Sequence, residues 1–220
     1  LAHDYGALVH TDAVQAAGRI LVDMQNLGVD LLTLSAHKLG GPQGVGALVL
    51  RGGVDIDPLV RGGGQELNRR AGTENTAGIV GFGVAAALTR DTLPDMDRVR
   101  LLRDRLEDGI RTSVAEAVIW GPDSDRVATT TCVSVAGVPA DKQVMALDLE
   151  GICVSAGSAC SSGKVTASPV LLAMGAGEDV ARAAIRISLG WASRADDVDR
   201  FLDVWPRFIA RMQVREAQAS

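Results

Sequence analysis

The chain has 220 residues, and 47% of them are hydrophobic, which is enough apolar material for one large domain or two small ones. Its formal net charge of −5 gives it no attraction for nucleic acid or for an anionic membrane surface. No apolar stretch approaches the roughly 20 residues that a membrane-spanning helix needs. We therefore expect a soluble globular protein, and we expect neither direct nucleic-acid binding nor a membrane partner.

Three cysteines, Cys132, Cys153 and Cys160, form an odd set without a CxxC pair. This argues against a disulfide framework and against a structural metal site, and it favours the reducing cytoplasm. Cys132 and Cys153 each lie in an apolar stretch, so we expect both to be buried thiols with structural roles. Cys160 stands apart in the small-residue run SAGSACSSG, where no packing requirement explains a cysteine.

The first third of the chain alternates short apolar runs with turn-forming residues. The runs ALVHTDA, DLLTLSAHK and GALVLRGG are predicted strands of an α/β layer, buried on both faces because they are almost continuously apolar. The first run ends near Asp12, and the second ends in Ser35, His37 and Lys38. Ligands of open α/β sheets lie at the carboxyl ends of the strands, so we expect both polar clusters to face one crevice.

The polar residues at these strand ends allow two interpretations. A buried amine at Lys38 would form an imine with an aldehyde cofactor, which an arginine cannot do, whereas a solvated lysine would have no such role. Asp12 would keep a pyridinium nitrogen protonated, or it would simply cap a helix near an exposed Gln15. The glycine-rich segment 62–73 would bind an anion through its backbone amides, or it would be a solvated linker.

The pattern changes after about residue 94. Residues 95–110 have apolar side chains at helical spacing and are predicted as an amphipathic helix, and residues 126–138 contain a predicted strand. A short helix is expected to stop at Gly151, and a long final helix to begin with Ser193 as its cap and to kink or stop at Pro206. Helices and strands without a βαβ alternation indicate an α+β domain after the α/β layer.

Five stretches occur in an order that resembles the successive motifs of one enzyme family. They are HTDAVQAAG, LSAHKLGGPQGVGAL, GGGQELNRRAGTEN, LEGICVSAGSACSSG and AIRISLGW. Together they resemble the class I (NifS/IscS-like) cysteine desulfurases, which are fold-type I pyridoxal-phosphate enzymes of the class V aminotransferase family. The resemblance implies an α/β, PLP-dependent transferase fold. Residues 1–90 would be the C-terminal part of the large, mostly parallel-sheet domain that binds the cofactor, and residues 91–220 the small domain with the cysteine loop.

The resemblance also implies how pyridoxal 5'-phosphate would be held. Asp12 would pair with the pyridine nitrogen, and Gln15 would reach the phenolic oxygen of the ring. Ser35 and His37 would hold the phosphate, and Thr73 would reach a phosphate in the neighbouring subunit of a homodimer. No metal is implied.

Three further residues would act on the substrate, L-cysteine. Lys38 would attach the cofactor and remove the proton from the α-carbon of cysteine, and Arg186 would bind the cysteine carboxylate. Cys160 would attack the substrate sulfur as a thiolate, so that a persulfide forms on Cys160 and L-alanine is left. The sulfur would pass to an acceptor protein of iron-sulfur cluster assembly or of nucleic-acid thiolation.

Two alternatives remain open from the sequence: a selenocysteine lyase of the same fold, and a fragment that carries sulfur without cofactor chemistry. The family's pattern begins before Leu1, and the chain opens LAHDYGALVH without an initiator methionine. We therefore expect the chain to correspond to the C-terminal half of a cytoplasmic desulfurase and to be inactive alone. It would be one of two polypeptides, a segment of a longer protein, or a decayed remnant. The remnant is the least favoured because Asp12, Lys38, Cys160 and Arg186 are all present.

Overall fold

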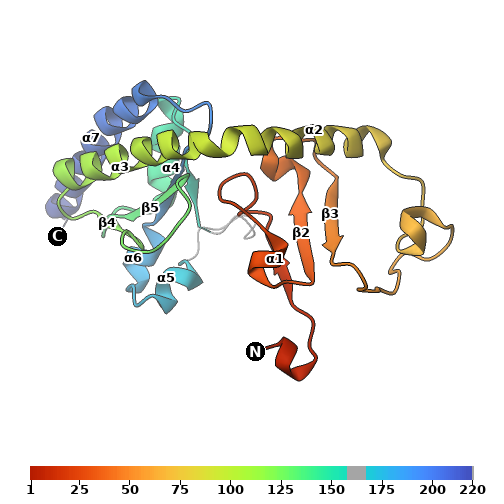
Figure 1. Cartoon of the computed structure of the whole chain (residues 1–220). Coiled ribbons are helices and arrows are strands. Elements are labelled where there is room, and N and C mark those ends of the chain that lie inside the picture. The colour runs from red at the N-terminus through yellow and green to blue at the C-terminus, as the bar shows by residue number, and fades with distance from the viewer. Residues whose placement is uncertain (158–166, 220) are drawn as a thin grey trace. The chain divides into compact units, whose positions relative to one another are not determined.

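The computed structural model describes residues 1–157 and 167–219, with side chains described as far as Val214. The chain divides into two compact units, unit 1 (Leu1–Pro94) and unit 2 (Asp95–Ser220), and each contains one β-sheet (Figure 1). Across the described ranges, no helix is both long enough and apolar enough to cross a membrane.

A three-stranded sheet in the order β1-β2-β3 organises unit 1. Its strands are β1 (His10–Asp12), β2 (Leu31–Ser35) and β3 (Gly46–Leu50), at the positions predicted from the apolar runs. β1 pairs with β2 in parallel, whereas β2 and β3 are antiparallel. The carboxyl ends of β1 and β2 therefore lie at the same edge of the sheet.

Short helical turns and one long helix complete unit 1. The long helix, α2 (Thr76–Thr92), begins where the Asn75 side chain accepts a hydrogen bond from the backbone N–H of Gly78 at 3.1 Å. Its buried face carries Phe82 and Ala85, and it packs on the turn that follows β2. The short turns are η1 (His3–Tyr5), α1 (Met24–Leu27), η2 (Ala36–Leu39), η3 (Gln65–Asn68) and η4 (Leu93–Asp95).

The strands of unit 1 are less buried than their apolar sequences predict. Leu32 of β2 is buried, but Leu48 and Val49 of β3 are 46% and 37% exposed. Within the described residues β3 is an edge strand, so it has a strand neighbour on one side only. Helix α2 packs on the turn after β2 and does not bury the side chains of β3. The prediction of a strand buried on both faces is thus wrong for β3.

A buried carboxylate fixes the beginning of this sheet. Asp30, directly before β2, has no exposed surface, and its Oδ2 accepts hydrogen bonds from the backbone N–H of Val9 and from His3 Nε2, both at 2.8 Å. Its Oδ1 lies 2.8 Å from Nη2 of Arg51. The hydrogen bond from Val9, followed by that from His3, outweighs the effect of burial and holds the pKa of Asp30 below its ordinary value. One side chain thereby ties together segments next to all three strands.

A four-stranded antiparallel sheet organises unit 2. In spatial order its strands are β4 (Val118–Ile119), β5 (Thr130–Ser134), β7 (Ile185–Ser188) and β6 (Ser155–Ala156). The strand predicted within residues 126–138 is confirmed as β5. Arg186 of β7 lies directly opposite Cys132 of β5 on one side and opposite Ser155 of β6 on the other.

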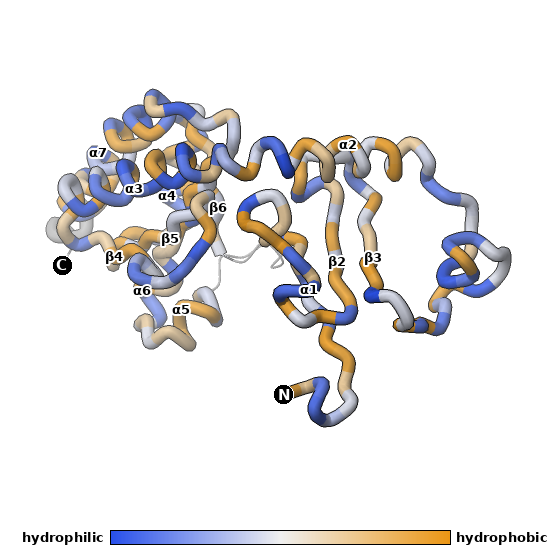
Figure 2. Tube along the Cα trace, in the orientation of Figure 1, coloured by the Kyte–Doolittle hydropathy of each residue, from blue (hydrophilic) through white to orange (hydrophobic). Residues whose placement is uncertain are grey.

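Long helices cover one face of this second sheet. They are α3 (Met96–Ser113), α4 (Ala140–Leu149) and α7 (Ala195–Ala219), and the first two confirm the helices predicted there. Their apolar side chains form one core with Val133 of β5 and with Ile185 and Ile187 of β7. Figure 2 shows hydrophobic and hydrophilic residues alternating along α3 and α7, as expected of helices with one buried face. Gly109 allows α3 and α7 to approach closely, because an added Cβ would meet Leu202.

Two short helices, α5 (Pro169–Ala173) and α6 (Glu178–Arg182), form a smaller apolar cluster. Leu171 of α5 and Ala181 of α6 belong to this cluster, and Cys132 of β5 packs against it. Side chains alternate between the two faces along a strand, and Val133, Ile185 and Ile187, which flank Cys132 or Arg186, point into the main core. Cys132 and Arg186 therefore share the face opposite the long helices.

The final helix passes its proline without ending. α7 continues through Pro206 to Ala219, so the helix does not stop at the proline, although a proline removes one backbone donor from the helix. Trp205 and Ile209, on either side of the proline, are completely buried in the core of unit 2. Their burial stabilises the helix on both sides of the missing hydrogen bond.

The start of α7 also differs from the predicted cap. Ser193 Oγ accepts a hydrogen bond from the backbone N–H of Gly190 at 3.0 Å and so closes the preceding turn. The helix begins two residues later, where Asp197 Oδ2 accepts a hydrogen bond from the backbone N–H of Arg194 at 2.8 Å. The residue directly before the helix is Arg194, so the predicted cap at Ser193 is wrong by one residue.

A buried amide connects three elements of unit 2. Gln143 of α4 has no exposed surface, and its Nε2 donates to the carbonyl oxygens of Val138 and Ala183, both at 2.8 Å. Its Oε1 accepts a hydrogen bond from Nε1 of Trp205 in α7 at 2.9 Å. Because Ala183 lies just before β7, this amide positions the strand that carries Arg186.

Candidate functional site

Unit 1 gathers several predicted cofactor residues at the carboxyl ends of its parallel strands. Asp12 is the last residue of β1 and Ser35 the last residue of β2, and the register places Asp12 opposite Thr33. The Oδ1 atom of Asp12 accepts a hydrogen bond from the backbone N–H of Val14 at 2.9 Å, which orients the carboxylate. The structure thus brings a carboxylate and a hydroxyl to one edge of the sheet.

The turn η2 directly follows β2 and adds an imidazole and an amine to this edge. Ser35 Oγ and His37 Nδ1 form a hydrogen bond of 2.8 Å, which holds the imidazole next to the strand end. The turn ends at Gly40, whose φ of 82° is a left-handed conformation that favours glycine. Ala36 is the buried residue of the turn, whereas His37 and Lys38 are exposed. The sequence left a buried and a solvated Lys38 open, and in the described chain Lys38 is exposed because the turn directs this residue toward solvent.

Gln15 is exposed but held in place by Arg19. Nη1 of Arg19 donates to the backbone carbonyl oxygen of Gln15 at 2.7 Å and also to its side-chain oxygen. Burial lowers the pKa of Arg19. Sequence reasoning missed this arginine, although its spacing of four residues from Gln15 is a signal that the two side chains meet on a helical turn.

Thr73 lies in the glycine-rich segment before α2 and is exposed. Gly72, directly before it, has a φ of 99° and donates its backbone N–H to Oε1 of Gln65 at 3.3 Å. Among the residues that the structure describes, no hydrogen bond joins Thr73 to Asp12, Ser35 or His37. Its predicted role concerns a neighbouring subunit, so it stays a prediction.

In unit 2, Arg186 is partly buried between two strands. Its Nε atom is buried and has no hydrogen-bond partner in the described part of the chain. Cys132, directly opposite, is a half-buried thiol, and burial raises its pKa while the positive charge of Arg186 opposes that effect. The structure thus places a guanidinium with an unused donor on the sheet.

The other two cysteines lie outside this arrangement. Cys153 is exposed, contrary to the expectation of a buried thiol, because its neighbours Ile152 and Val154 pack against the core in its place. The predicted nucleophile Cys160, together with the nearby Lys164, lies outside the described residues. The assignment of Cys160 therefore stays a prediction from the sequence.

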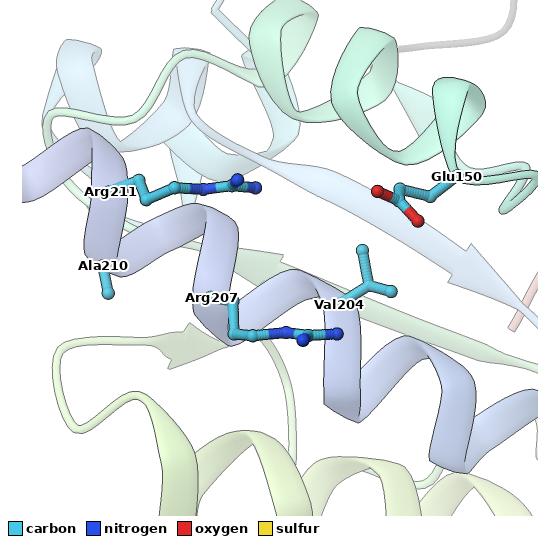
Figure 3. A pocket seen from close by; sticks show the side chains of 5 residues that line it. All are labelled: Glu150, Val204, Arg207, Ala210 and Arg211. Atoms are coloured by element: carbon cyan, nitrogen blue, oxygen red, sulfur yellow. The ribbon is translucent and has the colours of Figure 1, made fainter.

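A surface hollow of about 630 Å³ lies between α7 and the end of α4 (Figure 3). Arg207 pairs with Asp203, and Glu150 pairs with Arg200 at 2.9 Å, so these charges of the hollow are already balanced. None of the predicted site residues lines it. The lining residues are Glu150, Val204, Arg207, Ala210 and Arg211.

Comparison with known proteins places this arrangement in a family. The sequence profile of the aminotransferase class-V family matches residues 1–201. The chain belongs to the aminotransferase class-V family. Curated relatives of this class-V chain include the cysteine desulfurases of Cereibacter sphaeroides and Gluconacetobacter diazotrophicus, 48% and 45% identical over 97% of this chain and 54% of each relative. The chain therefore spans about half the length of the curated relatives it matches.

Solved structures resemble the class-V chain in the same way. The NifS-like protein from Rickettsia africae superimposes with a TM-score of 0.85 at 34% identity, covering 95% of this chain and 55% of that one. A structure described as SspA in complex with cysteine has a TM-score of 0.63 at 32% identity, covering 86% of this chain and 52% of that one. These similarities confirm the predicted α/β fold of the PLP-dependent transferases and the resemblance to cysteine desulfurases.

Proposed function

We propose that this chain supplies part of a pyridoxal-phosphate-dependent L-cysteine desulfurase, a transferase that converts L-cysteine to L-alanine and delivers the sulfur to an acceptor protein. The observation that carries the proposal is the gathering of Asp12, Ser35, His37 and Lys38 at the carboxyl ends of two parallel strands. Similarity to curated cysteine desulfurases over 97% of the chain supports it. The proposal concerns the complete protein, because the chain spans about half the length of those relatives.

The groups at this sheet edge fit pyridoxal 5'-phosphate chemically. The cofactor has a basic ring nitrogen, a phosphate and an aldehyde. The edge offers the carboxylate of Asp12, the hydrogen-bonded pair of Ser35 and His37, and the amine of Lys38. When bound, the cofactor supplies stabilisation of negative charge at the α-carbon of an amino acid.

The side chains of unit 1 would hold the cofactor and move one proton. Asp12 would keep the pyridine nitrogen protonated, and Gln15 would reach the phenolic oxygen. Ser35 and His37 would bind the phosphate. The amine of Lys38 would anchor the aldehyde and then accept the proton that leaves the α-carbon of L-cysteine.

Unit 2 would bind the substrate and take its sulfur. Arg186 forms no ion pair with a described carboxylate, which supports its role in binding the carboxylate of L-cysteine, since a guanidinium matches a carboxylate in shape and charge. Cys160, as a thiolate, would attack the substrate sulfur, so that a sulfur–sulfur bond forms and the carbon–sulfur bond breaks. The carbon keeps the bonding electrons and gains a proton, which yields L-alanine and a persulfide on Cys160.

We also propose the assembly in which this chemistry occurs. Residues 1–90 would be the C-terminal part of the cofactor-binding domain, and residues 91–220 the small domain. In a cytoplasmic homodimer, Thr73 would reach a phosphate of the neighbouring subunit. The persulfide would pass to an acceptor protein of iron-sulfur cluster assembly or of nucleic-acid thiolation.

Borohydride reduction of the complete protein, followed by peptide mass spectrometry, tests the cofactor site. Borohydride makes the bond between a lysine and the cofactor irreversible, and the chain has Lys38, Lys142 and Lys164 as its lysines. We expect the adduct on Lys38, its loss in Lys38→Ala and its retention in the matched control Lys142→Ala. An adduct that persists in Lys38→Ala contradicts the proposal.

Sulfide release from L-cysteine tests the nucleophile. Cys160→Ser is expected to retain the cofactor adduct but to stop sulfide release, whereas the exposed Cys153→Ser is expected to release sulfide normally. Normal release by Cys160→Ser would show that another group takes the sulfur.

A further inference from the structure

Arg186 stands between two neutral side chains in the sheet of unit 2. Directly opposite it lie Cys132 on β5 and Ser155 on β6. Residues that face each other across neighbouring strands project to the same side, with Cβ atoms about 4.5–5.5 Å apart. Ile185 and Ile187, on either side of Arg186 along β7, are buried in the main core. The guanidinium, the thiol and the hydroxyl therefore lie together on the face away from that core.

The charge of Arg186 is not balanced within the described part of unit 2. The other partly buried arginines of unit 2 have a carboxylate partner: Arg126 pairs with Glu107 at 2.8 Å, and Arg103 pairs with Asp104 at 2.7 Å. Arg186 forms no ion pair with a described carboxylate, and its buried Nε has no described partner. Opposite charges stabilise directly facing positions of a sheet, yet both positions that face Arg186 hold uncharged residue types.

The facing thiol stays neutral near pH 7. Burial raises the pKa of Cys132, and the charge of Arg186 opposes that rise without removing it. Ser155 is exposed, and its hydroxyl does not ionise. Neither neighbour can therefore neutralise Arg186.

We propose that Cys132 and Ser155 are positioning residues that confine the side chain of Arg186 and leave its charge available for the carboxylate of the amino-acid substrate. The inference rests on the proposed function of Arg186 and adds the reason why its charge is free. An acidic side chain at either position would pair with the guanidinium and compete with the substrate carboxylate. Asparagine, which has the size of aspartate but no charge, would not compete with the substrate carboxylate.

Calorimetric titration of the complete, cofactor-loaded protein with L-alanine tests this inference. L-Alanine is the proposed product. It has the carboxylate that Arg186 would bind, and it has no sulfur that could react. The matched variants are Ser155→Asp with Ser155→Asn, and Cys132→Asp with Cys132→Asn. We expect the Asn variants to bind within about threefold of the wild type and each Asp variant at least about tenfold more weakly than its Asn partner, which is about 1.4 kcal/mol. Because Ser155 is exposed, its pair keeps the inference testable if Cys132→Asp fails to fold.

Arg186→Ala separates the inference from the function on which it rests. If Arg186→Ala binds L-alanine as tightly as the wild type, Arg186 is not the carboxylate site, and both proposals are wrong. If Arg186→Ala binds weakly but the Asp and Asn variants bind equally at both positions, only the positioning role is overturned. In the Arg186→Ala background, we expect Ser155→Asp to change the affinity by less than about threefold, because the group through which it acts is absent.

Discussion

Replacing Gln143 with leucine would remove the amide that connects α4, the start of β7 and α7. Gln143→Leu keeps a similar side-chain volume, so the variant loses hydrogen bonds and creates little cavity. It leaves Nε1 of Trp205 and the carbonyl oxygens of Val138 and Ala183 without the partner they have in the native fold. The perturbation therefore isolates the polar contribution of one completely buried side chain.

The expected cost follows from these three hydrogen bonds. Leaving a buried polar group without its partner costs about 1–3 kcal/mol, and the lower part of that range applies to carbonyl groups that have a second lone pair. We therefore expect Gln143→Leu to lower the free energy of unfolding by about 3–5 kcal/mol. With a urea dependence of about 1–3 kcal/mol per molar, the unfolding midpoint should fall by roughly 2 M.

Urea unfolding of the full chain, followed by tryptophan fluorescence, provides the assay. All three tryptophans, Trp120, Trp191 and Trp205, lie in unit 2, so their emission reports on the unit that contains Gln143. Lys142→Leu, an exposed substitution at the preceding position of α4, is the matched control and should change stability by less than about 0.5 kcal/mol. A loss below about 1 kcal/mol in Gln143→Leu, or a loss equal to that of the control, would refute the reasoning.

Further stability predictions concern two buried acids and a proline. Asp30→Asn should reduce the acid sensitivity of unfolding. The folded-state pKa of Asp30 is lowered, so its carboxylate contributes stability above its unfolded pKa of about 3.9, and this contribution is lost as the pH falls through the folded pKa. The gap in urea midpoint between wild type and Asp30→Asn should therefore shrink on acidification, and a constant gap between pH 7 and pH 3 would contradict this. Glu107 accepts two hydrogen bonds from Arg126 at 2.8 Å, and Glu107→Ala should cost about 3–5 kcal/mol in chemical denaturation because it leaves a partly buried guanidinium unpaired. The exposed Glu116→Ala is its control, and equal losses in both would disprove the role of the pair. Pro206→Ala restores a backbone donor inside α7 and should raise the stability of unit 2 by about 1–3 kcal/mol, seen as a higher thermal midpoint. An unchanged or lower midpoint would show that the helix depends on the proline.

Much of the secondary structure was predictable because it follows from neighbouring residues. Apolar runs that end in polar residues predicted β1 and β2, and helical spacing of apolar residues predicted α3. The same local pattern placed Asp12 and Ser35 at strand ends. Parallel pairing of the two strands then brings these ends to one edge of the sheet.

Burial was less predictable than secondary structure, because it depends on what other parts of the chain cover a residue. The apolar run of β3 predicted a strand buried on both faces, yet Leu48 is 46% exposed where the sheet has its edge. Cys153 was expected to be buried, and it is exposed. Local hydrophobicity favours burial, but the packing of neighbouring elements determines whether a residue is buried.

By itself, the sequence determined many of the helices and strands, the family resemblance and the residue types available for chemistry, since these depend on the order of residues along the chain. Only the tertiary structure decided that Gln143 meets Trp205 and that Arg186 stands between Cys132 and Ser155. These residues are far apart in sequence, and no local periodicity encodes the register with which their strands and helices meet. That register comes from packing side chains into one core, where a shift of one residue would turn Ile185 and Ile187 out of it and turn Arg186 in.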